Sequence, residues 1–338
     1  MRKYIFLALI SVALISVNYW AQIDPPPVLR VYSGKAMGAA FSVTWVETKA
    51  HPSVQLEVDA ILQRITDQMS TYKPDSQLSQ FNRFRGVEWF DVSTEVVAVI
   101  AIAQEVSSVS DGVFDVTVKP LVAAWGFGPD ASSLAPSEAQ LALVANTVGY
   151  QYLELRQSPP ALRKRIPELQ VDLNGIAPGY AVDQISVALT RLGIDDYLVD
   201  VGGELRIAGH KAPGVKWRIA IETPEAAGAA TDSAYELEAT SLGTSGDYRN
   251  YYERDGQRFS HTIDPRTRRP IAHRLASVTV LAKDCAHADA FATVLNVLGP
   301  DDGFKFAQHN QLSTLMLIRT EAGTFEHRRS GFFASDTP

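Results

Sequence analysis

The spacing of apolar residues predicts helices and strands in alternation along the chain. Residues 41–46 alternate between apolar and polar side chains, as in a strand with one buried face. Between Val58 and Met69 apolar residues recur at intervals of three and four, which predicts an amphipathic helix. Ser93 is placed to cap a second helix that is apolar on most sides and is ended by Asp111 and Gly112.

The second half of the chain mixes both patterns. Residues 169–194 read as a strand, a glycine-bearing loop and a helix ended by Gly193. Further helices are predicted at 138–146 and at 286–298, the latter stopped by Gly299 and Pro300. Further strands are predicted in segments 197–209, 217–222, 234–239, 277–282 and 313–319. Because this order is not a regular βαβ series, we predict an α+β fold with a mixed, largely antiparallel sheet packed with helices.

Composition narrows the function classes. Of the 338 residues, 46% are hydrophobic and 20% charged, which is typical of a globular protein. The formal net charge of −7 argues against a nucleic-acid-binding protein, which normally has a basic surface. Cys285 is the only cysteine, so no intramolecular disulfide can form, and we expect this thiol to be a buried small side chain.

The N-terminus has the features of a targeting segment. Arg2 and Lys3 precede an apolar run of about 14 residues, within the length range of a signal-peptide core. We predict a signal peptide or N-terminal membrane anchor at 1–22, a Pro-rich linker at 23–30 and one folded domain at 31–333. A buried helix is the alternative for the apolar run, and the pattern leaves cleavage open because no small-x-small site follows it.

A carboxylate and a hydroxyl form the first candidate site. Asp289 and Thr293 are four residues apart on a predicted helix, so they lie on one face. Such oxygen ligands suit Mg²⁺, which keeps positions open for phosphates or water. By spacing alone the pattern is weak, because an Asp and a Thr on an ordinary solvated helix face are far commoner than a metal site.

Two further segments carry candidate chemistry. In "DLNGIAPGYAVD" (172–183), Gly175 and Gly179 flank a loop before a helix N-terminus, where an anion is favoured, although a tight turn needs the same glycines. The stretch "TSGDYRNYYERDGQRFSHTIDP" (244–265) contains His261, a candidate general acid or base, with Ser260 and Asp264 as groups that would orient it. The other six histidines show no metal-ligand spacing.

Several blocks of the chain resemble, in the family's order, the FAD:protein FMN transferases of the ApbE family. The blocks run from about Met37 to Leu317, and together they are far more specific than any one alone. They are "MSTYKPDSQLSQFN", "DGVFDVTVKPLVAAWGFGP", "DLNGIAPGYAVD", "LVDVGGELRIAG", "TSGDYRNYYERDGQRFSHTIDPRTRRPI" and "ADAFATVLNVLGP".

The resemblance implies an ApbE-like flavin transferase fold over 31–333 and an enzyme that splits FAD at the diphosphate. Such an enzyme moves FMN onto a threonine hydroxyl of a target protein, releases AMP and uses Mg²⁺. It implies a periplasmic protein, soluble or anchored to the inner membrane, whose target is a subunit of a membrane redox complex. Two alternatives from the residues remain: an FAD pyrophosphatase that gives FMN and AMP, and a non-catalytic flavin-binding assembly protein.

The resemblance also implies roles for individual residues. It makes Asp289 and Thr293 side-chain metal ligands, with backbone oxygens near Gly175 and Ala292, and makes His261 catalytic. It places FAD contacts at Met37, Tyr72, Ala124, Trp125, Gly126, Asp172, Pro178 and Ile263. Tyr72 and Trp125 would offer flat faces to the flavin or adenine ring.

This chain departs from the family pattern at three points. Pro178 stands where relatives often have Lys or Glu, and Arg268 stands where glycine is common after Asp-Pro-x-Thr. The usual lipoprotein cysteine is absent. These departures bear on FAD contacts, on one turn and on the mode of anchoring.

Overall fold

The computed structural model describes residues 28–130, 135–224, 231–246, 251–254 and 257–335. The predicted signal peptide or anchor at 1–22 lies outside these residues. Within them, every helix is too short or too polar to cross a membrane.

The described residues form seventeen strands, eight α-helices and one short 3₁₀ helix. The strands are β1 (Val28–Ala36), β2 (Ala39–Glu47), β3 (Phe90–Asp91), β4 (Leu153–Arg156), β5 (Ala161–Lys164), β6 (Tyr197–Val201), β7 (Glu204–Ala208), β8 (Trp217–Glu222), β9 (Thr231–Leu237), β10 (Thr240–Gly246), β11 (Tyr251–Arg254), β12 (Gln257–Ser260), β13 (Ile263–Asp264), β14 (Arg269–Pro270), β15 (Leu275–Ala282), β16 (Ser313–Arg319) and β17 (Phe325–Ser330). The helices are α2 (Val54–Met69), α3 (Gln77–Arg83), α4 (Thr94–Val109), α5 (Lys119–Ala124), α6 (Glu138–Ala145), the 3₁₀ helix η1 (Tyr150–Tyr152), α7 (Ala177–Arg191), α8 (Cys285–His309) and α9 (Phe332–Ser335).

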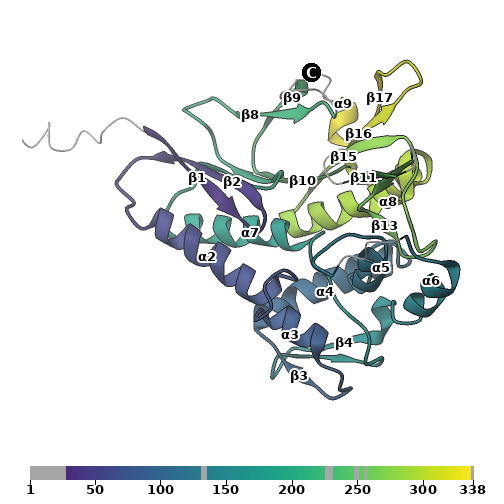
Figure 1. Cartoon of the computed structure of the whole chain (residues 1–338). Coiled ribbons are helices and arrows are strands. Elements are labelled where there is room, and N and C mark those ends of the chain that lie inside the picture. The colour runs from purple at the N-terminus through teal and green to yellow at the C-terminus, as the bar shows by residue number, and fades with distance from the viewer. Residues whose placement is uncertain (1–27, 131–134, 225–230, 247–250, 255–256, 336–338) are drawn as a thin grey trace, which may run out of the picture.

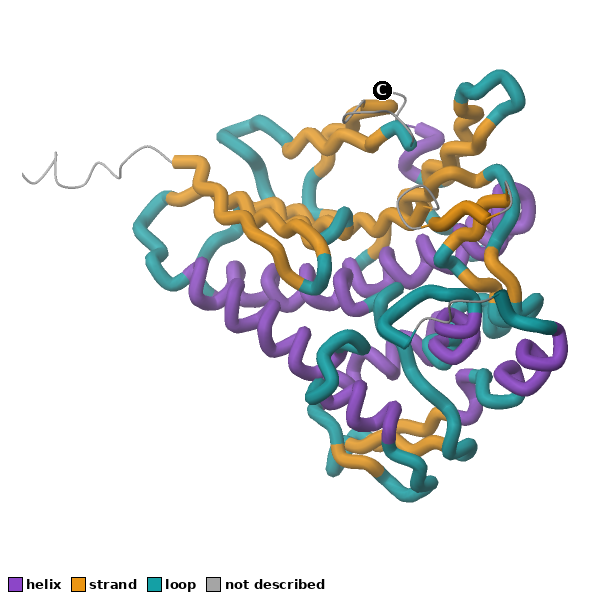
Figure 2. Tube along the Cα trace, in the orientation of Figure 1, coloured by secondary structure: helices purple, strands orange, loops and turns teal. Residues whose placement is uncertain are grey.

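A single large sheet organises the fold. Among the described residues it has eight strands in the order β1-β2-β6-β7-β10-β15-β16-β17, and each neighbouring pair is antiparallel. Helices α7 and α8 lie along one face, with α2 and α4 outside them, while the β8–β9 hairpin and α9 lie on the other face (Figures 1 and 2). The α+β prediction is confirmed, and this sheet is wholly antiparallel rather than mixed.

Local patterns account for the first helices. In α2 the predicted apolar positions are all buried, and in α4 the side chain of Ser93 accepts a hydrogen bond from the backbone N–H of Val96, as expected for an N-cap. The interior residues of α4 are buried on several sides, for example Val99 and Ile100. These helices form the main core together with α7.

One predicted boundary and one predicted strand differ from the structure. Strand β1 begins at Val28, inside the segment predicted as linker, because its backbone pairs with β2 as far as Glu47. The strand predicted from residue 169 does not form. The backbone N–H and C=O of Val171 bond instead to the side-chain amide of Asn82, at 2.7 and 2.8 Å, so this segment is held by a side chain rather than by a neighbouring strand.

Helix α8 does not stop at Gly299, where its end was predicted. The chain kinks at Gly299, with φ of 76° and ψ of −173°, and resumes helical structure as far as His309. Pro300 has no N–H to donate to the carbonyl of Asn296, four residues earlier. The Nε2 atom of His273 lies 2.7 Å from that carbonyl oxygen and replaces the missing donor. The Nδ1 atom of His273 accepts from the N–H of Leu275 at 3.3 Å, which fixes the Nε2–H tautomer.

Replacing His273 by alanine is expected to destabilise the protein by about 1–3 kcal/mol, because the buried carbonyl of Asn296 would lose its donor. Urea denaturation measures this change. His309→Ala at the exposed end of α8 is the control and should change stability by less than about 0.5 kcal/mol. Equal stabilities of the two variants would contradict the role given to His273.

Candidate functional site

A cavity of about 1270 Å³ opens beside the large sheet. Pockets that hold one small molecule usually measure about 300–1,000 Å³, so this cavity has room for a large ligand and part of a second. Its walls come from distant parts of the chain: the β1–β2 turn, the end of α2, the start of α7, the β6–β7 turn, β8, β10, the segment around His261, and α8.

The start of α7 packs directly against the first turns of α8. A Cβ atom on Gly179 would lie 2.4 Å from the carbonyl oxygen of Cys285, so only glycine permits this approach. The N–H of Gly179 donates to Oδ2 of Asp289 at 3.1 Å. The first turn of α7 and the candidate metal carboxylate on α8 are therefore in direct contact.

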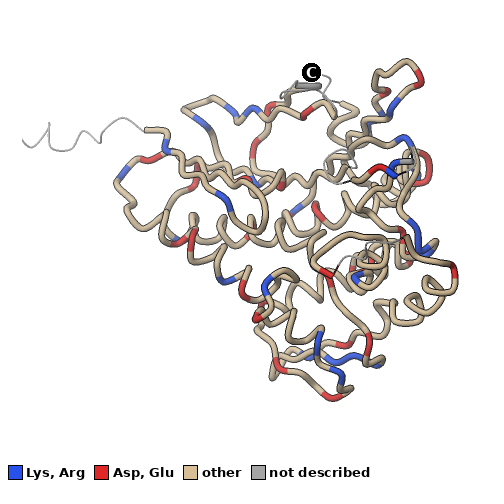
Figure 3. The backbone as a smooth tube through the Cα atoms, in the orientation of Figure 1, with Lys and Arg blue, Asp and Glu red and all other residues tan. Residues whose placement is uncertain are grey.

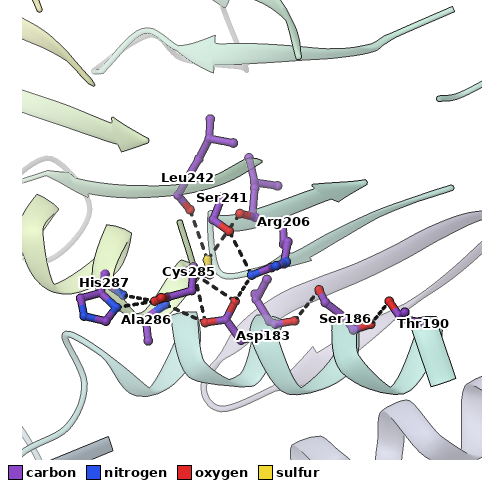
Figure 4. Close-up of polar contacts among 12 residues, drawn as sticks. Asp183, Ser186, Thr190, Arg206, Ser241, Leu242, Cys285, Ala286 and His287 are labelled. Atoms are coloured by element: carbon purple, nitrogen blue, oxygen red, sulfur yellow. Dashed lines mark hydrogen bonds and ion pairs between the residues drawn. The ribbon is translucent and has the colours of Figure 1, made fainter. Parts of the chain in front are cut away.

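Asp183 fixes the register of α7 against α8 (Figure 4). Its carboxylate accepts from the backbone N–H groups of Cys285 and Ala286, at 3.0 Å each, and from Nη1 of Arg206 at 2.8 Å. These N–H groups are the first of α8 and have no partner within the helix. One helix thus caps the other, and this cap holds Asp289 against Gly179 in the first turn of α7.

Asp289 is a buried carboxylate. It is 6% exposed, and burial raises the pKa of its carboxyl to about 7 despite the hydrogen bond from Gly179. A cation beside this buried carboxylate would stabilise its charged form. Asp289 is therefore suited to hold a metal ion.

Thr293 and Gly175 lie beside this carboxylate. Thr293 is one turn further along α8, and a Cβ atom on Gly175 would lie 3.1 Å from its Oγ1. The described residues contain no cluster of three or more His, Cys, Asp or Glu that would enclose a metal by themselves. A single carboxylate with a hydroxyl and a glycine cradle fits Mg²⁺, which uses few protein oxygens and keeps positions for phosphates and water.

The cavity lining is strongly acidic. Figure 3 shows acidic and basic residues interspersed along the described chain, whereas the lining contains one lysine, Lys73, and six acidic residues. These acidic residues are Asp115, Asp172, Asp200, Glu204, Glu222 and Asp289. An anionic ligand in this cavity needs a cation beside it, which is a second reason to place one at Asp289.

His261 lines the same cavity as Asp289 and Thr293. Its ring lies edge-on to Phe127, with centroids 6.4 Å apart. The two predicted orienting groups hold the chain on either side of it: Ser260 accepts from the N–H of Thr262 at 3.2 Å, and Asp264 is bound by the guanidinium of Arg266 at 2.9 and 3.0 Å. The structure therefore gives Ser260 and Asp264 a role in the backbone path around His261.

Ten of the thirteen predicted site residues line the cavity. They are Met37, Tyr72, Gly126, Asp172, Gly175, Pro178, His261, Ile263, Asp289 and Thr293. Ala124, Trp125 and Ala292 are not in the lining. The side chain of Ala292 is in the core beneath α8, so a contribution from this residue would come from its backbone.

Trp125 is not a free stacking surface, contrary to the prediction. Its ring is 6% exposed and stacks on Phe259, with centroids 5.9 Å apart. Its Nε1–H donates to the carbonyl oxygen of Arg268 at 2.8 Å. Arg268 has a φ of 63°, the left-handed conformation that glycine adopts most easily, so the bond from Trp125 supports the turn at which this chain departs from the family. The other departure, Pro178, is in the first turn of α7, where a missing N–H costs little.

The sequence did not single out several polar groups of the lining. Asn174, Thr244 and Ser245 all line the cavity. They lie inside or next to segments that were recognised, but single hydroxyl and amide side chains carry no spacing signal. Gly202 and Gly203, which form the β6–β7 turn, also line the cavity, and their pairing after a strand was the one available signal.

Comparison with known proteins gives a consistent assignment. The sequence model of the ApbE family matches residues 37–316. A relative from Vibrio cholerae named FAD:protein FMN transferase is 41% identical, with 95% of this chain and 97% of the relative covered. A Haemophilus influenzae protein of the same name is 39% identical, with 89% of each chain covered.

Solved structures agree. The flavin transferase ApbE from Vibrio cholerae superposes with a TM-score of 0.84 at 38% identity, with 92% of this chain and 100% of that chain covered. The apo form of the Pseudomonas stutzeri flavinyl transferase ApbE has a TM-score of 0.84 at 37% identity, with 91% of this chain and 96% of that chain covered. In sequence and in fold, the chain belongs to the ApbE family.

Proposed function

We propose that this protein is an FAD:protein FMN transferase, which moves FMN from FAD to a threonine hydroxyl of a target protein and releases AMP. One observation carries the proposal: the Asp289–Thr293–Gly175 cluster and His261 line one cavity with room for FAD and part of an acceptor. The names of the relatives support the same activity.

The reaction exchanges one phosphorus–oxygen bond for another. The threonine Oγ attacks the phosphorus on the FMN side of the diphosphate, and the bond from this phosphorus to the bridging oxygen breaks. AMP departs with that oxygen, and the threonine proton leaves to a base or to the departing group. Catalysis of such a step depends mainly on positioning and on compensation of charge.

The residues of the cavity divide these tasks. Asp289 and Thr293, with backbone oxygens near Gly175 and Ala292, would hold Mg²⁺. When bound there, the ion neutralises charge on the diphosphate and polarises the phosphorus. His261 takes the proton of the threonine hydroxyl or gives one to the departing AMP. The ring of Tyr72 is 62% exposed at the cavity wall and offers a face to the flavin or adenine ring.

The direct test is incubation with FAD, Mg²⁺ and a target peptide that contains an acceptor threonine. We expect the peptide to gain the mass of FMN minus water and AMP to appear in equal amount, and a chelator should stop both. Rapid release of free FMN without a peptide would identify a pyrophosphatase instead. A stable yellow complex that never yields AMP would identify a flavin-binding protein.

We further propose that the protein works in the periplasm on a subunit of a membrane redox complex. The charged N-terminus and apolar run within residues 1–22 support export or anchoring. Cell fractionation, with N-terminal sequencing of the mature protein, tests this location and decides between cleavage and anchoring.

A further inference from the structure

Asn296 continues the face of α8 that carries the candidate metal ligands. It follows Asp289 by seven residues and Thr293 by three, so the three side chains lie along one side of the helix. Asn296 is fully buried, at 0% exposure. A fully buried asparagine is uncommon and calls for a physical reason.

The amide of Asn296 joins α8 to the segment of His261. Its Nδ2 donates to Oγ of Ser245 on β10 at 3.0 Å and, more weakly, to Oγ1 of Thr262 at 3.4 Å. Both hydroxyl groups belong to residues of the cavity wall, and Thr262 directly follows His261.

Thr262 is also fixed through its backbone. Its N–H donates to Oγ of Ser260 at 3.2 Å, and its carbonyl accepts from the N–H of Ile271 at 3.0 Å. With the side-chain bond from Asn296, three polar groups of the residue next to His261 are anchored. A displacement of Thr262 would therefore be transmitted to the imidazole.

The backbone of Asn296 is held as well, but one side-chain atom is not. Its carbonyl oxygen is bound by Nε2 of His273 at the kink of α8. Its side-chain Oδ1, in contrast, is buried and makes no hydrogen bond within the described part of the chain. A buried acceptor without a partner costs about 1–3 kcal/mol, so stability alone does not explain an amide at this position.

We propose that Asn296 is a positioning residue, which fixes His261 relative to Asp289 and Thr293 through Thr262 and Ser245. The metal ligands are on a helix, whereas His261 is on an irregular segment between β12 and β13. The amide bridges these two elements across the cavity wall. It thereby fixes the distance between the imidazole of His261 and the candidate cation site at Asp289 and Thr293. The expected effect on kcat rests on the proposed function, whereas the expected effect on the position of the His261 side chain does not.

The kinetic test compares Asn296→Ala with Asn310→Ala. Asn310 ends the same helix, and its amide donates only locally, to the carbonyl of Phe306. We expect Asn296→Ala to lower kcat for FMN transfer about 10–100-fold with the KM for FAD nearly unchanged, since a small misplacement of a reacting group has this effect. Asn310→Ala should keep the wild-type kcat.

The structural test follows the imidazole of His261 by NMR in protein labelled with ¹³C-histidine, without FAD or metal. The signal is assigned from its absence in His261→Gln. Asn296→Ala should shift or broaden it, and Thr262→Val, which removes only the hydroxyl, should do the same. Asn310→Ala should leave it in place.

A double-mutant cycle tests the route through Thr262. If Asn296 acts on His261 through this hydroxyl, Asn296→Ala combined with Thr262→Val should lower kcat little further than Asn296→Ala alone. Should Asn296→Ala fail to fold, Thr262→Val and Ser245→Ala probe the same bonds with isosteric or smaller side chains.

An unmoved His261 signal, or fully additive losses of kcat, would overturn the proposal. A raised KM with unchanged kcat would also overturn it, because that pattern indicates lost ligand binding rather than lost positioning. If the wild-type protein transfers no FMN, the proposed function fails, and the NMR signal alone then decides the role of Asn296.

Discussion

Replacement of Asp289 by asparagine is expected to abolish FMN transfer, with a rate loss of at least about 10³-fold. Asparagine keeps the shape of the side chain and can still accept from the N–H of Gly179, but it removes the negative charge that would hold Mg²⁺. Loss of the several kcal/mol that a metal ion supplies to a phosphoryl transfer accounts for this magnitude. Mass spectrometry of the target peptide measures the residual rate.

The same substitution is expected to stabilise the metal-free protein. Burial raises the pKa of Asp289 from 3.8 to about 7, so the folded state binds this proton more tightly than the unfolded state. The contribution of Asp289 to the free energy of unfolding is therefore fully present below pH 4 and is lost as the pH rises to 7. At pH 8 the wild-type protein bears a cost of up to about 4 kcal/mol, which Asp289→Asn should remove.

Thermal unfolding at pH 5 and pH 8, with and without Mg²⁺, separates these effects. Without metal, Asp289→Asn should have the higher Tm at pH 8 and a smaller difference from wild type at pH 5. Mg²⁺ should raise the Tm of wild type but not that of the variant, because only the carboxylate form binds it. Asp301→Asn is the matched control on α8: its carboxylate pairs with Arg328, which lowers its pKa, so its loss should not raise stability or change transfer. A Tm of Asp289→Asn that still rises with Mg²⁺ would contradict the metal assignment.

The parts of the fold that depend on local pattern were predictable. The apolar period of α2 and the Ser93 cap of α4 determine these helices from a few neighbouring residues. The kink of α8 was not predictable, because the donor that replaces the missing N–H of Pro300 is His273, on a segment that precedes the helix. The backbone around Val171 escaped prediction for the same reason, since its partner is the amide of Asn82.

In the candidate site, too, features set by neighbouring residues were predictable and features set by distant residues were not. The placement of Asp289 and Thr293 on one helix face was predictable from the helical repeat, whereas their role as metal ligands came only from the family resemblance; the structure brings Gly175 against Thr293. Only the open stacking face expected of Trp125 was wrong, because the faces of an aromatic ring are covered by residues remote in sequence, here Phe259. Asn296 gave no signal, since the meaning of one buried amide depends on which hydroxyl groups from other elements reach it.

Replacement of His261 by glutamine is expected to lower the rate of FMN transfer about 10²–10⁴-fold, the range found when a general acid or base is removed. Glutamine retains a polar side chain but cannot exchange a proton near neutral pH. The candidate metal ligands on α8, Asp289 and Thr293, are unchanged by this substitution, so Mg²⁺ should still raise the Tm. The KM for FAD should change little, which would place the loss in the chemical step.

The pH dependence of kcat then shows which way the proton moves. If His261 accepts the proton of the threonine hydroxyl, the wild-type rate rises with pH as the imidazole becomes neutral; if it donates to the departing AMP, the rate falls instead. Either dependence should be absent from His261→Gln. The control His309→Gln, exposed at the end of α8, should reproduce the wild-type profile. A pH profile that persists in His261→Gln would assign the proton transfer to another group of the cavity. The imidazole is identified as the proton-transfer group only if the variant loses both its rate and its pH dependence.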